Sequence, residues 1–95
     1  MTAKIELTKA AKKGFEKAPI QAKAKFLAWS LAVEEQGLAK VRLQKGYHDE
    51  PLRGQLKGLR SIRLNDQWRA FYVVKADGLI ELIEVTEINP HAYKK

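Results

Sequence analysis

The chain has 95 residues, 45% hydrophobic and 31% charged, and its 18 lysines and arginines outnumber its 11 acids, for a formal net charge of +7. This length predicts one domain over residues 1–95, and the charge favours an anionic partner such as nucleic acid, an acidic protein or a lipid surface. The lack of cysteine excludes disulfides and thiolate sites, while the lack of a membrane span or a signal-peptide pattern predicts a cytoplasmic location.

The N-terminal part of the chain predicts a short strand followed by two helices. Ile5 and Leu7 alternate with polar residues, which indicates the strand. Thr8 is a suitable N-cap for a helix over Lys9–Lys17. A longer helix is predicted over Ile20–Gln36, and Gly37 is its expected C-terminal end.

The longer helix carries apolar residues on two sides. One stripe contains Ile20, Ala24, Leu27 and Leu31, and the other contains Ala22, Phe26, Trp29 and Val33. A helix that is apolar on two sides must be covered on two sides. One stripe is expected to cover a sheet, and the other is expected to contact the first helix or a partner protein. In either case Trp29 is predicted to anchor the second stripe, and Val33 extends it.

The remainder of the chain predicts a β-meander. Residues 38–48 indicate a loop, with or without a helical extension. The expected strands and turns are Leu59–Leu64, a turn at residues 65–67, Trp68–Lys75, a hairpin turn at residues 76–78, and Leu79–Glu87, with Asn89-Pro90 ending the last strand. This order predicts an α+β domain. Its N-terminal strand and two-helix hairpin would pack on a mainly antiparallel four-stranded sheet.

Positive charge is concentrated around the first two strands of the meander. Alternation puts Arg69 on the same strand face as Phe71, and a guanidinium held there could clamp a phosphate in bidentate fashion. The alternative is an ion pair with an acid of the last strand, Glu81 or Glu84. Arg63 is a better neighbour for Arg69 than Arg60, which shares the opposite face with Ile62 and Leu64. The preceding loop contributes Arg53 and Lys57 as candidate phosphate contacts.

Few side chains could act as general acids or bases near neutral pH. The candidates are His48, Glu50 and His91, with a perturbed lysine or tyrosine as the remaining option. The two histidines show no recognised metal-ligand spacing, and the chain has no glycine-rich phosphate loop. We therefore expect neither a metal nor a cofactor.

Over nearly its whole length the chain resembles the RelE/ParE superfamily of bacterial toxins from toxin–antitoxin pairs. Within that superfamily it is similar to the ribosome-dependent mRNA endonucleases of the YoeB, RelE and HigB types. The segment Glu50-Pro51-Leu52-Arg53 and the run that continues to Arg69-Ala70-Phe71-Tyr72 carry the resemblance to YoeB. The segment Ile62–Arg69 is also similar to HigB-type toxins.

The resemblance implies a role for each matching residue. Glu50 matches the general base, Arg63 and Arg69 match the arginines that hold the scissile phosphate, and His91 and Tyr93 match a C-terminal pair. The implied reaction is attack of the RNA 2′-hydroxyl on its own phosphodiester without a metal, with His91 or Tyr93 as the acid or as a base-stacking ring.

The charge pattern, the helix stripes and the resemblance together predict contact residues and partners. The basic residues Arg53, Lys57 and Arg60 would contact RNA, and Trp29 and Val33 would contact the antitoxin. The expected partners are an acidic antitoxin, the ribosome and mRNA. The free chain would be a monomer that forms a heteromeric complex with its antitoxin. Two other functions remain open at this point: a non-enzymatic ParE-like inhibitor that binds DNA gyrase, and a plain RNA-binding module.

Overall fold

The computed structural model describes residues 2–56, 58–75 and 80–90. Three α-helices, two 3-10 turns and five strands follow one another along the described chain. In order they are β1 (Thr2–Leu7), α1 (Lys9–Lys17), α2 (Ile20–Gln36), α3 (Leu38–Val41), η1 (Lys45–Tyr47), β2 (Glu50–Pro51), η2 (Gly54–Leu56), β3 (Arg60–Arg63), β4 (Trp68–Val74) and β5 (Ile80–Pro90).

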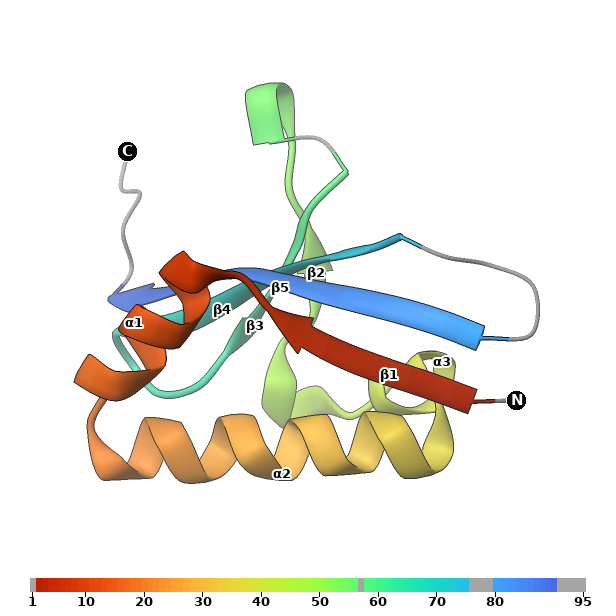
Figure 1. The fold of residues 1–95 in the computed structure, drawn as a ribbon, viewed down its shortest axis with the longest axis horizontal. Helices are drawn as coiled ribbons and strands as arrows, with labels where there is room; N and C mark the ends of the chain where they lie inside the picture. The colour runs from red at the N-terminus through yellow and green to blue at the C-terminus, as the bar shows by residue number, and fades with distance from the viewer. Residues whose placement is uncertain (1, 57, 76–79, 91–95) are drawn as a thin grey trace.

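The strands form one sheet in the order β1-β5-β4-β3-β2, with β1 parallel to β5 and the other neighbours antiparallel. Figure 1 shows α2 running along one side of this sheet, with α1 and α3 near its two ends. The opposite side carries no α-helix over the described strands. The predicted α+β arrangement is therefore confirmed, and one face of the sheet remains for other contacts.

Local signals explain the two main helices. The Thr8 side chain accepts a hydrogen bond from the backbone N–H of Ala11 at 3.1 Å, so it caps α1 as predicted. The same hydroxyl donates to the carbonyl of Thr86 at 2.7 Å, which ties the start of α1 to β5. At the other end of the helical pair, Gly37 ends α2 with a φ of 89°. A side chain would be strained in that conformation.

The sheet differs from the prediction in its extent. It has five strands, because the two-residue strand β2 adds to the four expected, and residues 38–48 contain α3 and η1. The last strand continues to Pro90, where it pairs with Trp68, so Asn89 lies within the strand. The predicted hairpin turn at residues 76–78 lies outside the described residues.

One irregularity decides which residues of β5 face the helices. Phe71 pairs with Glu87 while Tyr72 pairs with Val85, so Thr86 is an extra residue in β5. Such a bulge reverses the alternation of the strand. Val85 points into the core before the bulge, and Ile88 does so after it.

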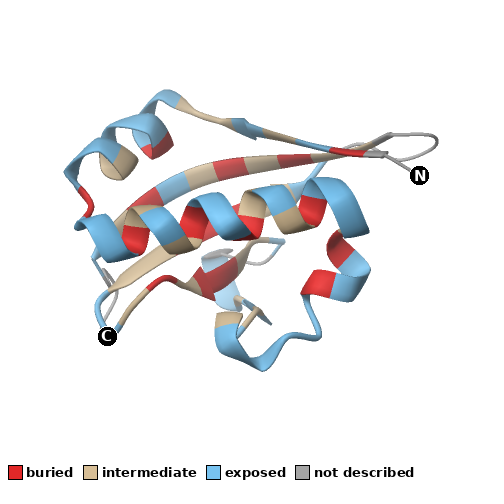
Figure 2. Cartoon of the chain, turned by 90° about the horizontal axis from the view of Figure 1, so that it is seen from below, coloured by how far each residue is buried: buried red, intermediate tan, exposed pale blue. Residues whose placement is uncertain are grey.

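In α2, the stripe that was expected to contact the antitoxin is buried, and the other stripe is exposed. The side chains of Trp29 and Val33 are both 0% exposed and belong to the core. Neither offers surface to an antitoxin, so that predicted contact is wrong for this structure. The other stripe is open, with Ile20 at 80%, Leu27 at 56% and Leu31 at 58% exposure. Figure 2 shows this alternation of buried and exposed residues along the helix.

Candidate functional site

The helix-free face of the sheet gathers polar and charged residues in two rows across the strands. Residues that pair directly across neighbouring strands point to the same face. The first row contains Glu50, Ser61, Phe71 and Glu87, and the second contains Arg63, Arg69 and Asn89. We call this surface the open face. Side chains of the residues between these rows, such as Ala70 and Ile88, pack into the core on the helix side.

Two arginines of neighbouring strands lie opposite each other on the open face. Arg63 and Arg69 pair directly, so their Cα atoms are about 5 Å apart. This confirms that Arg63 shares a face with Arg69. Within the described residues neither arginine forms an ion pair, and the alternative of Arg69 paired with Glu81 or Glu84 is not found. Glu84 instead lies 3.7 Å from the ammonium of Lys75.

Several side-chain atoms of the open face are buried and have no hydrogen-bond partner in the described chain. They are Nε of Arg63, Nη1 of Arg69, Oγ of Ser61 and Oδ1 of Asn89. A buried polar group without a partner costs about 1–3 kcal/mol, and more when it is charged. Three of these four residues lie in one cross-strand row, and two carry positive charge. The arrangement is therefore suited to an anionic ligand that accepts hydrogen bonds from both arginines.

Glu50 lies on β2, the strand next to the one that carries Arg63. It is exposed and pairs with Ser61, so it is a diagonal neighbour of Arg63. Diagonal neighbours in a sheet lie about 7–8 Å apart. A carboxylate at this separation can contact a group bound to the arginines without being neutralised by them.

A buried network holds the segment that carries Glu50, and sequence reasoning missed it. The Asp49 carboxylate accepts hydrogen bonds from the hydroxyl of Tyr72 at 2.5 Å and from Nε of Arg60 at 2.7 Å. Its side chain is fully buried. Burial, followed by the hydrogen bond and the charge of Asp49, raises the pKa of the Tyr72 hydroxyl. Asp49 belongs to no motif, so only the three-dimensional contact with Tyr72 identifies it.

This network also corrects the expectation for Arg60. Its partner across the sheet is Tyr72, whose ring packs on Trp29 in the core. Arg60 therefore lies on the helix side of the sheet, away from Arg63 and Arg69. Desolvation lowers the pKa of its guanidinium, but the hydrogen bond and charge of Asp49 outweigh that effect and raise it. Its position indicates a structural ion pair and does not support the predicted RNA contact.

The remaining predicted residues fall outside this arrangement or beyond the described chain. Arg53 is exposed in the segment that leads from β2 to η2, which rises from the sheet on the side away from α2 (Figure 1). His48 is exposed and adopts a left-handed backbone with a φ of 52°. The predicted RNA contact Lys57 and the predicted catalytic residues His91 and Tyr93 lie outside the described residues.

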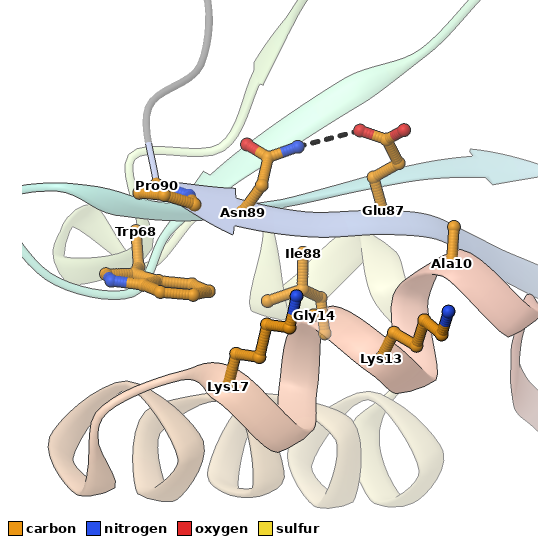
Figure 3. Close-up of a pocket in the computed structure, with 9 residues that line it drawn as sticks. All are labelled: Ala10, Lys13, Gly14, Lys17, Trp68, Glu87, Ile88, Asn89 and Pro90. Carbon is orange, nitrogen blue, oxygen red and sulfur yellow. Dashed lines mark hydrogen bonds between the residues drawn. The ribbon is translucent and has the colours of Figure 1, made fainter.

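A separate hollow of about 320 Å³ lies between α1 and the end of β5. Figure 3 shows the indole of Trp68 at one side of it, with Lys13 and Lys17 on α1. Ile88 points toward α1, whereas Glu87 and Asn89 project from the other side of β5. The hollow is therefore on the helix side of the sheet. In the described part of the chain, no group of three or more histidines or acids could hold a metal ion, and no helix is long and apolar enough to span a bilayer.

No protein-family model and no curated protein matches the chain, but solved structures are similar to it over nearly its full length. A YoeB/ParE toxin from Agrobacterium tumefaciens has a TM-score of 0.73 at 20% identity and covers 93% of this chain and 98% of its own. The E. coli DinJ–YafQ toxin–antitoxin complex gives 0.73 at 21%, covering 97% and 96%. The archaeal RelE–RelB complex from Pyrococcus horikoshii gives 0.71 at 21%, covering 99% and 100%. These likenesses confirm the predicted RelE-like fold.

Proposed function

We propose that this chain is the toxin of a toxin–antitoxin pair in the RelE/ParE superfamily and that it cleaves mRNA on the ribosome. The observation that carries the proposal is the arginine pair on the open face. Arg63 and Arg69 pair directly and have buried N–H groups without a partner in the described chain, and Glu50 is a diagonal neighbour of Arg63. The likeness to toxins of the YoeB, YafQ and RelE types supports the same function.

The proposed reaction uses the nucleophile that RNA itself supplies. Glu50 takes the proton of the 2′-hydroxyl as the oxygen attacks the neighbouring phosphorus, so that an O2′–P bond forms. The two guanidiniums stabilise the added charge on the phosphorane oxygens. The P–O5′ bond then breaks, and the 5′-oxygen receives a proton from His91 or Tyr93. The product ends in a 2′,3′-cyclic phosphate, and no step requires a metal.

The proposed partners follow from the same assignment. An acidic antitoxin would complement the net charge of +7, and similar structures include a DinJ–YafQ and a RelE–RelB complex. We place the protein in the cytoplasm, where it would meet translating ribosomes. Free toxin would be a monomer and would be neutralised in a heteromeric complex.

The test is cleavage of a defined mRNA on translating ribosomes. Wild-type protein is expected to produce a discrete cut with a 2′,3′-cyclic phosphate end, and a 2′-deoxy substitution at the cut nucleotide is expected to abolish it. Arg69→Ala should slow cleavage by about 10²–10³-fold, because one preorganised charge donor is lost. Glu50→Gln should slow it by about 10²–10⁴-fold, because the base is lost.

Arg42→Ala is the matched control, since Arg42 is an exposed arginine that follows α3 on the helix side. It is expected to cleave as the wild type does. Intact mRNA at saturating wild-type protein would overturn the nuclease assignment. Gyrase-dependent DNA breaks under the same conditions would instead favour the ParE-like function, in which Glu50 and Arg69 have no chemical role.

A further inference from the structure

The open face has a second carboxylate that the reaction above does not use. Glu87 is exposed and lies opposite Phe71, which makes it a diagonal neighbour of Arg69. Figure 3 shows its side chain on the same side of β5 as Asn89, with Ile88 on the other side. The arginine pair is thus flanked by Glu50 toward β2 and by Glu87 toward β5.

Asn89 holds the Glu87 carboxylate in place. The Nδ2 of Asn89 donates to Oε1 of Glu87 at 2.7 Å. The opposite amide orientation would bring two oxygens together, so the hydrogen bond fixes both groups. The described hydrogen bond of Glu87 uses Oε1 and not Oε2, and the buried Oδ1 of Asn89 has no partner in the described chain. Asn89 itself pairs with Arg69, so the carboxylate is positioned relative to the arginine pair.

A fixed carboxylate beside a phosphate site weakens phosphate binding by repulsion unless it accepts hydrogen bonds from the same ligand. An ionised carboxylate is only an acceptor, and its two oxygens match two adjacent N–H donors. Single-stranded RNA is read on the Watson–Crick edges of its bases. Among the four bases, only guanine presents two adjacent donors there, N1–H and the N2 amino group.

We propose that Glu87, held by Asn89, binds the Watson–Crick edge of a guanine next to the phosphate that Arg63 and Arg69 hold. This inference rests on the proposed function and adds a base preference to it. Glu50 is the less suitable reader, because no described hydrogen bond fixes its side chain. A proton acceptor needs only to reach the 2′-hydroxyl, whereas a side chain that recognises a nucleobase must be held in a fixed position.

The experiment compares cleavage of three mRNAs that differ at one position beside the cut. The nucleotide at this position carries guanine, hypoxanthine (inosine) or adenine. Inosine keeps N1–H and lacks the N2 amino group. Wild-type protein is expected to cut the guanine message roughly tenfold to a hundredfold faster than the adenine message, with inosine between them. Glu87→Gln should bring the three rates close together, and Asn89→Ala should reduce the preference in part.

Glu81→Gln is the matched control, because it makes the same change on the same strand, opposite Ala3 and away from the arginines. It should keep the wild-type preference, and thermal unfolding of each variant shows whether it is folded. An unchanged guanine preference in Glu87→Gln would overturn the inference, as would an equal loss of rate on all three messages. If wild-type protein cuts none of the messages, it is the proposed function that fails.

Discussion

Gly14 is the residue at which α1 contacts the backbone of β5. An added Cβ would lie 1.8 Å from the carbonyl oxygen of Ile88 and 2.8 Å from its carbonyl carbon. Real Cβ atoms do not approach backbone atoms so closely, so any other residue forces α1 away from β5. The glycine that weakens the helix by up to about 1 kcal/mol is therefore required by the packing. The same contact fixes Ile88, and with it the direction of Glu87 and Asn89.

Gly14→Ala is predicted to lower the free energy of unfolding by about 1–3 kcal/mol, because the strain of overpacking exceeds the gain in helix propensity. Urea unfolding followed by circular dichroism measures this change. Gly46→Ala is the control, since a Cβ at Gly46 meets nothing within 4 Å, and it should shift stability by less than about 0.5 kcal/mol. Equal effects of the two substitutions would contradict the packing argument.

The strands show which parts of the sheet can be predicted from alternation in the sequence. Alternation predicted the arginine face of β4 because that strand is regular between Trp68 and Val74. The same rule does not hold along β5, since the bulge at Thr86 reverses the alternation and brings Glu87 to the open face. The spacing of Val85 and Ile88 is the only sequence signal for this change. A bulge is defined by pairing with another strand, so the spacing alone does not predict one until the partner strand is known.

Strand β2 was missed for a different reason. It has only two residues, Glu50 and Pro51, and both are exposed, so it shows no apolar alternation. Its place in the sheet depends on Asp49, which is bound by Tyr72 and Arg60. These three residues are far apart in the sequence, and their convergence follows from the sheet register. The family resemblance could therefore suggest that Glu50 lies beside Arg63, whereas the apolar pattern gives no sign of it.

The network around Tyr72 predicts an alkaline limit to stability. Burial, with the Asp49 hydrogen bond and charge, raises the pKa of the folded Tyr72 hydroxyl above the roughly 10 expected in the unfolded chain. The folded state thus holds this proton more tightly. The resulting stabilisation is fully present below about pH 10 and is lost as pH rises from there toward the folded pKa.

Tyr72→Phe should therefore reduce the pH dependence of the unfolding free energy between about pH 9.5 and 11, while lowering stability at pH 7 by about 1–3 kcal/mol because Asp49 loses a partner. Urea unfolding over this pH range measures both effects. Glu50→Gln, an exposed neighbour of Asp49, should give a profile parallel to the wild type. A Tyr72→Phe profile as steep as the wild-type profile would rule out the proton as the cause.

The two sides of the sheet differ in what they carry. The helices cover one side of the sheet and bury Trp29 and Val33, whereas the other side presents Arg63 and Arg69 beside the projecting segment that carries Arg53. The net charge of +7 belongs to the entire chain, and it attracts any polyanion. Under the proposed function, only charges on the open face and on the projecting segment are expected to contact phosphates directly.

The salt dependence of RNA binding distinguishes direct phosphate contacts from attraction by the overall charge of the chain. Each cation that neutralises a phosphate of single-stranded RNA contributes about −0.7 to the slope of log K against log salt concentration. Arg53→Gln is therefore predicted to make that slope shallower by about 0.7. Arg42→Gln removes the same charge from the helix side and should leave the slope unchanged. Fluorescence anisotropy of a short labelled RNA, titrated at several salt concentrations in the Glu50→Gln background, measures the slope without cleavage of the probe. If both substitutions reduce the slope equally, RNA binding responds to overall charge, and Arg53 makes no phosphate contact of its own.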